Sequence, residues 1–163
     1  MNLGYACINT ALSSNGIMTN RTMRRKTFDA KGIDYVSDLS LLNVKDLKTI
    51  VQWNNEMGIK LFRLSSQIFP WSDEYNIKDL KDYKEICGLM LEIGTIAKDA
   101  GQRLTMHPGP YNCLASPTKK VVEKTIRELN FHSSQFDMMG YEPSPYNKIN
   151  IHVGGAYNET ASN

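Results

Sequence analysis

The alternation of hydrophobic and polar positions predicts short strands separated by long helices. Short apolar runs bounded by turn residues are typical of strands, and they occur at Leu3–Ile8, Leu61–Ser66, Leu104–His107 and Ile149–His152. Apolar residues recur at helical spacing over three segments, at about Val44–Met57, Leu80–Ala100 and Thr118–Met139. Helices of this length can cross between parallel strands, so the pattern predicts an α/β fold with a parallel sheet.

Glycine and capping residues set the expected ends of these helices. Gly58, Gly101 and Gly140 each follow a periodic segment, as a C-terminal stop does. Asn43 is expected to be the N-cap of the first helix. Residues 13–40 have no strong period, and we expect them to form a long loop or an insertion.

The number of strands limits the architecture. A closed (β/α)8 barrel needs eight strands and about 200–250 residues, whereas this chain has 163 residues and predicts about four βα units. We therefore expect one domain over residues 1–163, either half of a TIM-type barrel or an open sheet.

Two histidines stand at equivalent places in the pattern. His107 and His152 each end a predicted strand, and glycine follows each within two residues. The carboxyl ends of parallel strands meet at one mouth of a barrel, and imidazole is a good ligand for a divalent metal. The sequence therefore favours a metal site, although a hydrogen-bonded residue at a strand end remains an alternative. His132 lies within a helical pattern and is expected to pack or to bond a neighbour.

Other polar residues have two interpretations that the sequence alone leaves open. Glu74 follows the second strand, where it is either a solvated charge or a residue of the same mouth. The basic run Arg21–Lys26 is either a solvated loop or a phosphate contact. Tyr5 and Tyr111 lie near strand ends and either stack on bases or cover the core.

Composition excludes few classes of function. The chain is 41% hydrophobic and 22% charged, with a net charge of +2, which is too small to indicate nucleic acid by itself. No apolar run approaches the roughly 20 residues of a membrane span, so we expect no membrane partner. Cys7, Cys87 and Cys113 have no metal-ligand spacing, and we interpret them as reduced, mostly buried thiols of an intracellular protein.

A series of short segments resembles the UV damage endonuclease family. The segments run in order over essentially the whole chain: Gly4–Asn9, Asn20–Thr22, Trp53–Asn54, Gly58–Ile59, Arg63–Ser66, Phe69–Pro70, Leu104–Gly109, Leu114–Pro117, Glu128–His132, Met139–Gly140 and Ile149–Gly155. No single segment is decisive, but the series together is specific. The resemblance implies a TIM-type barrel that nicks damaged duplex DNA immediately 5′ to ultraviolet photoproducts.

The resemblance also implies a role for individual residues. Family members hold up to three divalent metals, typically manganese, with His, Glu and Asp side chains, and His107 and His152 match two of the histidine ligands. Tyr5 and Asn9 match residues placed against the damaged nucleotides and the catalytic site. Pro110–Tyr111 matches a pair that probes the duplex and fills the space left by flipped-out bases. Arg21, in the matching loop segment, is expected to contact DNA.

The chain departs from the family pattern at two positions. Proline stands at residue 110, where the family usually has glutamine, and proline can wedge a base step but cannot hydrogen-bond an orphaned base. Glu74 stands where a histidine is usual, and a carboxylate can still bind manganese. The other ligands of the family lie in the second half of the barrel, so a missing C-terminal half is an expected partner.

Two further hypotheses remain open on the sequence. One is a metal-dependent sugar isomerase or epimerase on a related barrel, which explains histidines at strand ends equally well. The other is a non-catalytic fragment that needs a partner half.

Overall fold

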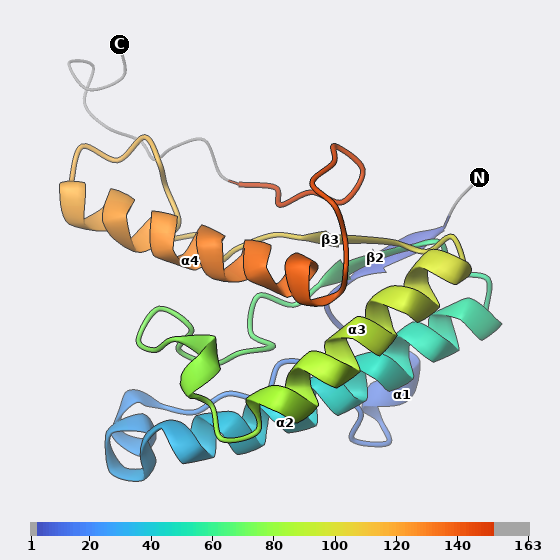
Figure 1. The fold of residues 1–163 in the computed structure, drawn as a ribbon, viewed down its shortest axis with the longest axis horizontal. Helices are drawn as coiled ribbons and strands as arrows, with labels where there is room; N and C mark the ends of the chain where they lie inside the picture. The colour runs from blue at the N-terminus through green and yellow to red at the C-terminus, as the bar shows by residue number, and fades with distance from the viewer. Residues whose placement is uncertain (1–2, 152–163) are drawn as a thin grey trace.

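The computed structural model describes residues 3–151 as an α/β fold (Figure 1). The elements in chain order are β1 (Gly4–Ala6), α1 (Thr10–Ser13), α2 (Arg25–Glu56), β2 (Leu61–Leu64), the 3-10 helix η1 (Ile77–Asp79), α3 (Tyr83–Asp99), β3 (Arg103–Met106) and α4 (Lys119–Met138). The predicted order is confirmed for the first three strands and the three long helices.

The strands form one parallel sheet in the order β1-β2-β3. Gly4 lies opposite Leu61, and Leu61 lies opposite Arg103. A further parallel bridge joins Met106 to Ile149, where the fourth strand is predicted to begin. Asn150 and Ile151 follow with no strand assignment, and His152 lies outside the described residues.

One face of the sheet is covered by α2 and α3, which lie side by side (Figure 1). Phe62, Leu64, Leu104 and Met106 are fully buried, and they form a core with apolar residues of α2 and α3. The alternate positions project to the opposite face, because successive side chains of a strand point to opposite sides.

That opposite face is more open. Gly4 and Ala6 are exposed, and Leu61 and Arg63 are only partly buried. The sheet of residues 3–151 is therefore fully packed on one face only.

The first long helix begins far earlier than expected, at Arg25. The prediction of an irregular loop over residues 13–40 is wrong for residues 25–40, which belong to α2. Gly32 has φ 66° and ψ −162°, so two helical segments meet there at a kink. Because this conformation breaks the helical period, the spacing of apolar residues before Gly32 does not continue in phase after it. The sequence therefore shows no single helical pattern over this segment.

Asn43 is not an N-cap. It lies inside α2, is fully buried, and holds the loop before the helix. Its Nδ2 donates to the carbonyls of Arg21 and Ile68, both at 3.0 Å, and its Oδ1 accepts from the Arg21 N–H at 3.1 Å. A buried amide with three backbone partners stabilises this connection, since each unpaired group would cost free energy.

The other two long helices are close to the prediction. The segment expected from Leu80 to Ala100 is α3, which begins at Tyr83. The segment expected over residues 118–139 is α4, one residue shorter at each end.

The expectations about membrane spans and cysteine burial can be compared with the structure. No helix among residues 3–151 is long and apolar enough to cross a bilayer. The cysteines are only partly buried, against the expectation of mostly buried thiols.

Helices α3 and α4 make a very close approach at Gly94. A Cβ placed on Gly94 would lie 1.9 Å from the Met139 carbonyl oxygen, at the C-terminal end of α4. Real Cβ atoms do not come so near to a backbone oxygen, so only glycine permits this contact.

We predict that Gly94→Ala destabilises the fold. The methyl group must push the end of α4 away, which costs about 1–3 kcal/mol or more in a packed core. Gly88→Ala, in the same helix, is the matched control because open space surrounds that position, and it gains up to about 1 kcal/mol of helix propensity. Urea denaturation measures both free energies of unfolding. Equal stability of the two variants would contradict the close approach.

Candidate functional site

The carboxyl ends of the three strands meet at one edge of the sheet. Parallel strands place the segments that follow β1, β2 and β3 at this edge. Residues 7–9, 65–76 and 107–118 form these segments, and most candidate residues from the sequence lie on them or beside them.

Tyr5 and Asn9 lie together at the helix-facing side of β1, and their predicted place at a catalytic site stays a prediction. The Asn9 Nδ2 donates to the Tyr5 hydroxyl at 2.8 Å, and this hydroxyl donates to the Asn54 Oδ1 at 2.6 Å. The Tyr5 ring packs on Phe62, with ring centroids 4.9 Å apart. Burial raises the pKa of the Tyr5 phenol, and the hydrogen bonds with Asn9 and Asn54 only partly oppose this, so the phenol stays neutral.

The network continues into the core through residues that the sequence analysis did not select. The Asn54 Nδ2 donates to the Gln102 Oε1 at 3.0 Å, and the Gln102 Nε2 donates to the Val51 carbonyl at 3.2 Å. Asn9 also caps α1, because its Oδ1 accepts from the Leu12 N–H at 3.0 Å. The available signal was Asn54, an amide at helical spacing from the apolar residues Ile50 and Val51. The structure therefore gives Tyr5 and Asn9 an anchoring role at the end of β1.

His107 follows β3 directly and is half-buried. Its Nδ1 lies 2.5 Å from the Asn150 carbonyl oxygen. Because a carbonyl only accepts, this contact requires a proton on Nδ1, as is usual for the ring nitrogen of a metal-binding histidine that does not bind the metal.

Glu74 lies in the segment after β2 and forms an ion pair. Its Oε1 is 2.8 Å from the Arg25 Nη1, at the start of α2. Within residues 3–151, no group of three or more His, Cys, Asp or Glu side chains is arranged to hold a metal ion. The described residues thus supply at most part of a metal site, and metal binding by His107, His152 and Glu74 stays a prediction.

Arg21 is engaged in contacts within the chain. Its guanidinium lies 2.6 Å from the Asp46 carboxylate and donates to the carbonyls of Gly16, at 2.7 Å, and Met18, at 2.6 Å. These contacts fix the loop before α2, and a contact with DNA stays a prediction.

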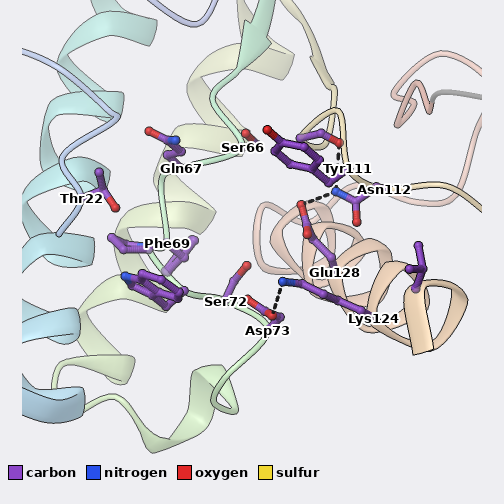
Figure 2. A pocket seen from close by; sticks show the side chains of 14 residues that line it. Thr22, Ser66, Gln67, Phe69, Ser72, Asp73, Tyr111, Asn112, Lys124 and Glu128 are labelled. Atoms are coloured by element: carbon purple, nitrogen blue, oxygen red, sulfur yellow. Dashed lines mark hydrogen bonds and ion pairs between the residues drawn. The ribbon is translucent and has the colours of Figure 1, made fainter. Parts of the chain in front are cut away.

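A pocket of about 380 Å³ opens between the segments that follow β2 and β3, beside α4 (Figure 2). Its lining is mixed polar and aromatic: Thr22, Ser66, Gln67, Phe69, Pro70, Trp71, Ser72, Asp73, Gly109, Tyr111, Asn112, Val121, Lys124 and Glu128. Tyr111 is 91% exposed, and Pro110 beside it is exposed as well. The turn predicted to probe DNA therefore projects from the protein at the rim of this pocket.

Side chains of α4 tie both segments to the wall of the pocket (Figure 2). Lys124 lies 3.0 Å from Asp73, and the Glu128 Oε1 accepts from the Asn112 Nδ2 at 2.7 Å. Burial would raise the pKa of Glu128, but hydrogen bonds from His132, Asn112 and the Gly109 N–H outweigh burial and lower this pKa. Glu128 is therefore a carboxylate at neutral pH. The sequence analysis did not select Glu128 or Asn112 individually.

His132 is buried within α4, as expected for a packing histidine. Its side chain is 1% exposed, its Nε2 lies 3.5 Å from the Glu128 Oε1, and its Nδ1 contacts the Gln135 amide at 3.0 Å.

Comparison with known proteins gives one consistent family. The family model described as UV-endonuclease UvdE matches residues 1–163. A putative UV-damage endonuclease of Acanthamoeba polyphaga mimivirus is 38% identical over 158 residues, which are 96% of this chain and 48% of that protein. A UV-damage endonuclease of Schizosaccharomyces pombe is 36% identical over 164 residues, with 95% of this chain and 26% of that protein covered.

The fold also matches a solved structure. The crystal structure of SacUVDE superposes with a TM-score of 0.82 and 31% sequence identity, and the match covers 97% of this chain and 51% of that chain. The chain thus spans about half the length of this structure and of the viral relative, and less of the yeast relative.

We predict that Tyr5→Phe destabilises the chain. Removing the hydroxyl leaves the Asn54 Oδ1 and the Asn9 Nδ2 without their shared partner, which costs about 1–3 kcal/mol where the groups are buried. Tyr146→Phe is the control, since this side chain is 54% exposed and the change there should stay within about 0.5 kcal/mol. The free energy of unfolding in urea measures both variants, and a Tyr5→Phe variant as stable as wild type would rule out the anchoring role.

Proposed function

The chain belongs to the UV-endonuclease UvdE family, and we propose that it forms the N-terminal part of a DNA repair endonuclease that nicks duplex DNA 5′ to ultraviolet photoproducts. The observation that carries this proposal is the family match over residues 1–163. The relatives named above are described as UV-damage endonucleases, and this favours DNA over a sugar as the substrate.

The exposed turn at the pocket rim fits a contact with damaged duplex. The Tyr111 ring is almost fully exposed and can stack on a base, since base stacking needs only an accessible aromatic face. Pro110 is a rigid apolar residue of the kind that wedges base steps apart. A lesion is already poorly stacked, so extruding it costs less than extruding sound bases, which gives selectivity.

We also propose that the complete site binds divalent metal, with manganese the first candidate. The chemistry of His107 fits, because its Nδ1 faces a backbone carbonyl, as the second nitrogen of a metal-binding histidine usually does. His152 and Glu74 are the other candidates of this chain. A divalent metal supplies activation of water and neutralisation of phosphate charge. The further ligands would come from outside residues 3–151.

We propose that the complete protein is a TIM-type barrel, of which this chain is about half. Three parallel strands in sequential order, with α2 and α3 on one face, are the arrangement of consecutive barrel units. The partly open face of the sheet would be the barrel interior, and the chain's coverage of about half of SacUVDE fits this size. The completing half is then the partner of this face, and a chain without it would be a non-catalytic fragment.

We predict that His107→Ala abolishes nicking by the completed barrel. A fusion of this chain to the remaining half of the mimivirus relative, given manganese and an ultraviolet-irradiated duplex, should cut 5′ to the lesion. Loss of His107 should lower the rate by roughly 100-fold or more, because even residues that only support metal ligands contribute 10–100-fold. Glu123→Gln, on the surface of α4, is the control. A folded fusion that never cuts irradiated DNA would refute the proposed function. Undiminished cutting by the His107→Ala variant would refute the role of His107 as a metal ligand.

We predict that Ala6→Trp prevents association with the completing half supplied as a separate chain. Ala6 lies on the open face, beside Arg63 of β2, and a barrel interior packed with side chains has no room for an indole. Thr95→Trp adds a similar volume on the exposed surface of α3 and should leave association unchanged. Isothermal calorimetry decides between them, and equal affinities would exclude this face as the interface.

A further inference from the structure

The side of α4 that faces the segment after β3 is polar. Thr125, Glu128, His132 and Gln135 recur at intervals of three and four residues and so share one face of the helix. The side chain of Glu128 is 18% exposed, and the other three residues are each 1% exposed. Burying polar groups costs free energy unless they have partners, so a helix that only packed would carry apolar residues here. The partners of this polar face therefore indicate its purpose.

These partners are backbone and side-chain groups around the exposed turn. The Glu128 Oε1 accepts from the Asn112 Nδ2 at 2.7 Å, and the same Nδ2 donates to the Gly109 carbonyl at 3.0 Å. The Thr125 hydroxyl accepts from the Cys113 N–H at 3.1 Å. Gly109 and Asn112 flank the Pro110–Tyr111 pair, so the carboxylate holds the Asn112 amide that joins the two ends of the turn.

The Glu128 carboxylate is also contacted by His132, which is in turn contacted by Gln135. The Gln135 amide nitrogen, which can only donate, lies 3.0 Å from the His132 Nδ1. Nδ1 is then the acceptor, and the ring proton sits on Nε2, which faces the Glu128 Oε1 at 3.5 Å. The Nε2–H of His132 thus faces the Glu128 carboxylate and favours its charged form.

We propose that Glu128, supported by His132, is a positioning residue that fixes the Pro110–Tyr111 turn in the shape in which Tyr111 contacts duplex DNA. Because the Tyr111 ring is 91% exposed, its position depends on the backbone of the turn, which the carboxylate holds through Asn112. The contact with DNA rests on the proposed function, whereas the hold on the turn rests on the geometry alone.

The hold is tested by amide hydrogen exchange in the 163-residue chain, resolved by residue with NMR. The N–H groups of Asn112 and Cys113 are hydrogen-bonded, to the Gly109 carbonyl at 3.2 Å and to Thr125, and both should be protected in the wild type. In Glu128→Ala and in the milder Glu128→Gln, protection of these two amides should fall by roughly tenfold or more. Glu123→Gln removes the same charge from an exposed position of the same helix and should leave them unchanged.

Amides in the buried part of α3, such as that of Ile93, report whether each variant is still folded. If Glu128→Ala unfolds the chain, the isosteric Glu128→Gln decides the result. Unchanged protection at residues 112 and 113 in a folded Glu128 variant overturns the hold.

The role in positioning Tyr111 is tested by the ratio of affinities for irradiated and intact duplex. Glu128→Gln should reduce this ratio about as far as Tyr111→Ala does. In the Tyr111→Ala background, Glu128→Gln should then have no further effect, since the turn has lost the side chain that it presents. If the two substitutions lower the affinity ratio independently and additively, the positioning role is overturned. This holds even when hydrogen exchange shows that Glu128 holds the turn.

The two failures can be told apart. A wild-type chain that binds both duplexes equally, alone and fused to the completing half, refutes the proposed function together with the DNA contact of Tyr111. The exchange measurement needs no DNA and still decides whether Glu128 holds the turn.

Discussion

The parallel arrangement of β1, β2 and β3 is the constraint on which the site depends. Each strand must be followed by a crossover that returns to the opposite end, so the three segments after the strands begin at one edge. Residues as distant in sequence as Asn9, Asp73 and Tyr111 are thereby directed to the same edge of a small sheet. The long helices α2 and α3 make these crossovers, and they also supply nearly half of the buried core residues that pack against the strands.

The strands and two of the long helices could be predicted because their signals are local. The apolar run of β3 is followed closely by Pro108 and Gly109, and α4 begins and ends within one residue of the segment expected from its spacing. The first half of α2 could not be predicted, because Gly32 interrupts the period in a way that resembles a loop. Asn43 was misassigned for a related reason. A polar residue ahead of an apolar run resembles a cap, and only the folded chain brings the Arg21 and Ile68 carbonyls to its amide.

The candidate site was predictable in its location but less so in its supporting residues. The turn after β3 carries its own signal in the sequence His107–Pro108–Gly109–Pro110–Tyr111. Glu128 has no such signal, because a glutamate on a helix is ordinarily solvated. Its importance appears only when α4 packs against the turn, because the Glu128 side chain is then mostly buried and bonded to Asn112. Residues that position others by tertiary contact leave little trace in the local pattern.

Tyr5 belongs to both the core and the strand edge. Its ring fills a place beside Phe62, while its hydroxyl joins the amides of Asn9 and Asn54, and Gln102 completes the chain of bonds. A substitution at any one of these positions changes the volume or the hydrogen-bond direction that the other three side chains must match. In evolution these four positions are therefore expected to covary as a set, with a substitution at residue 5 accepted mainly where residues 9, 54 and 102 have changed with it.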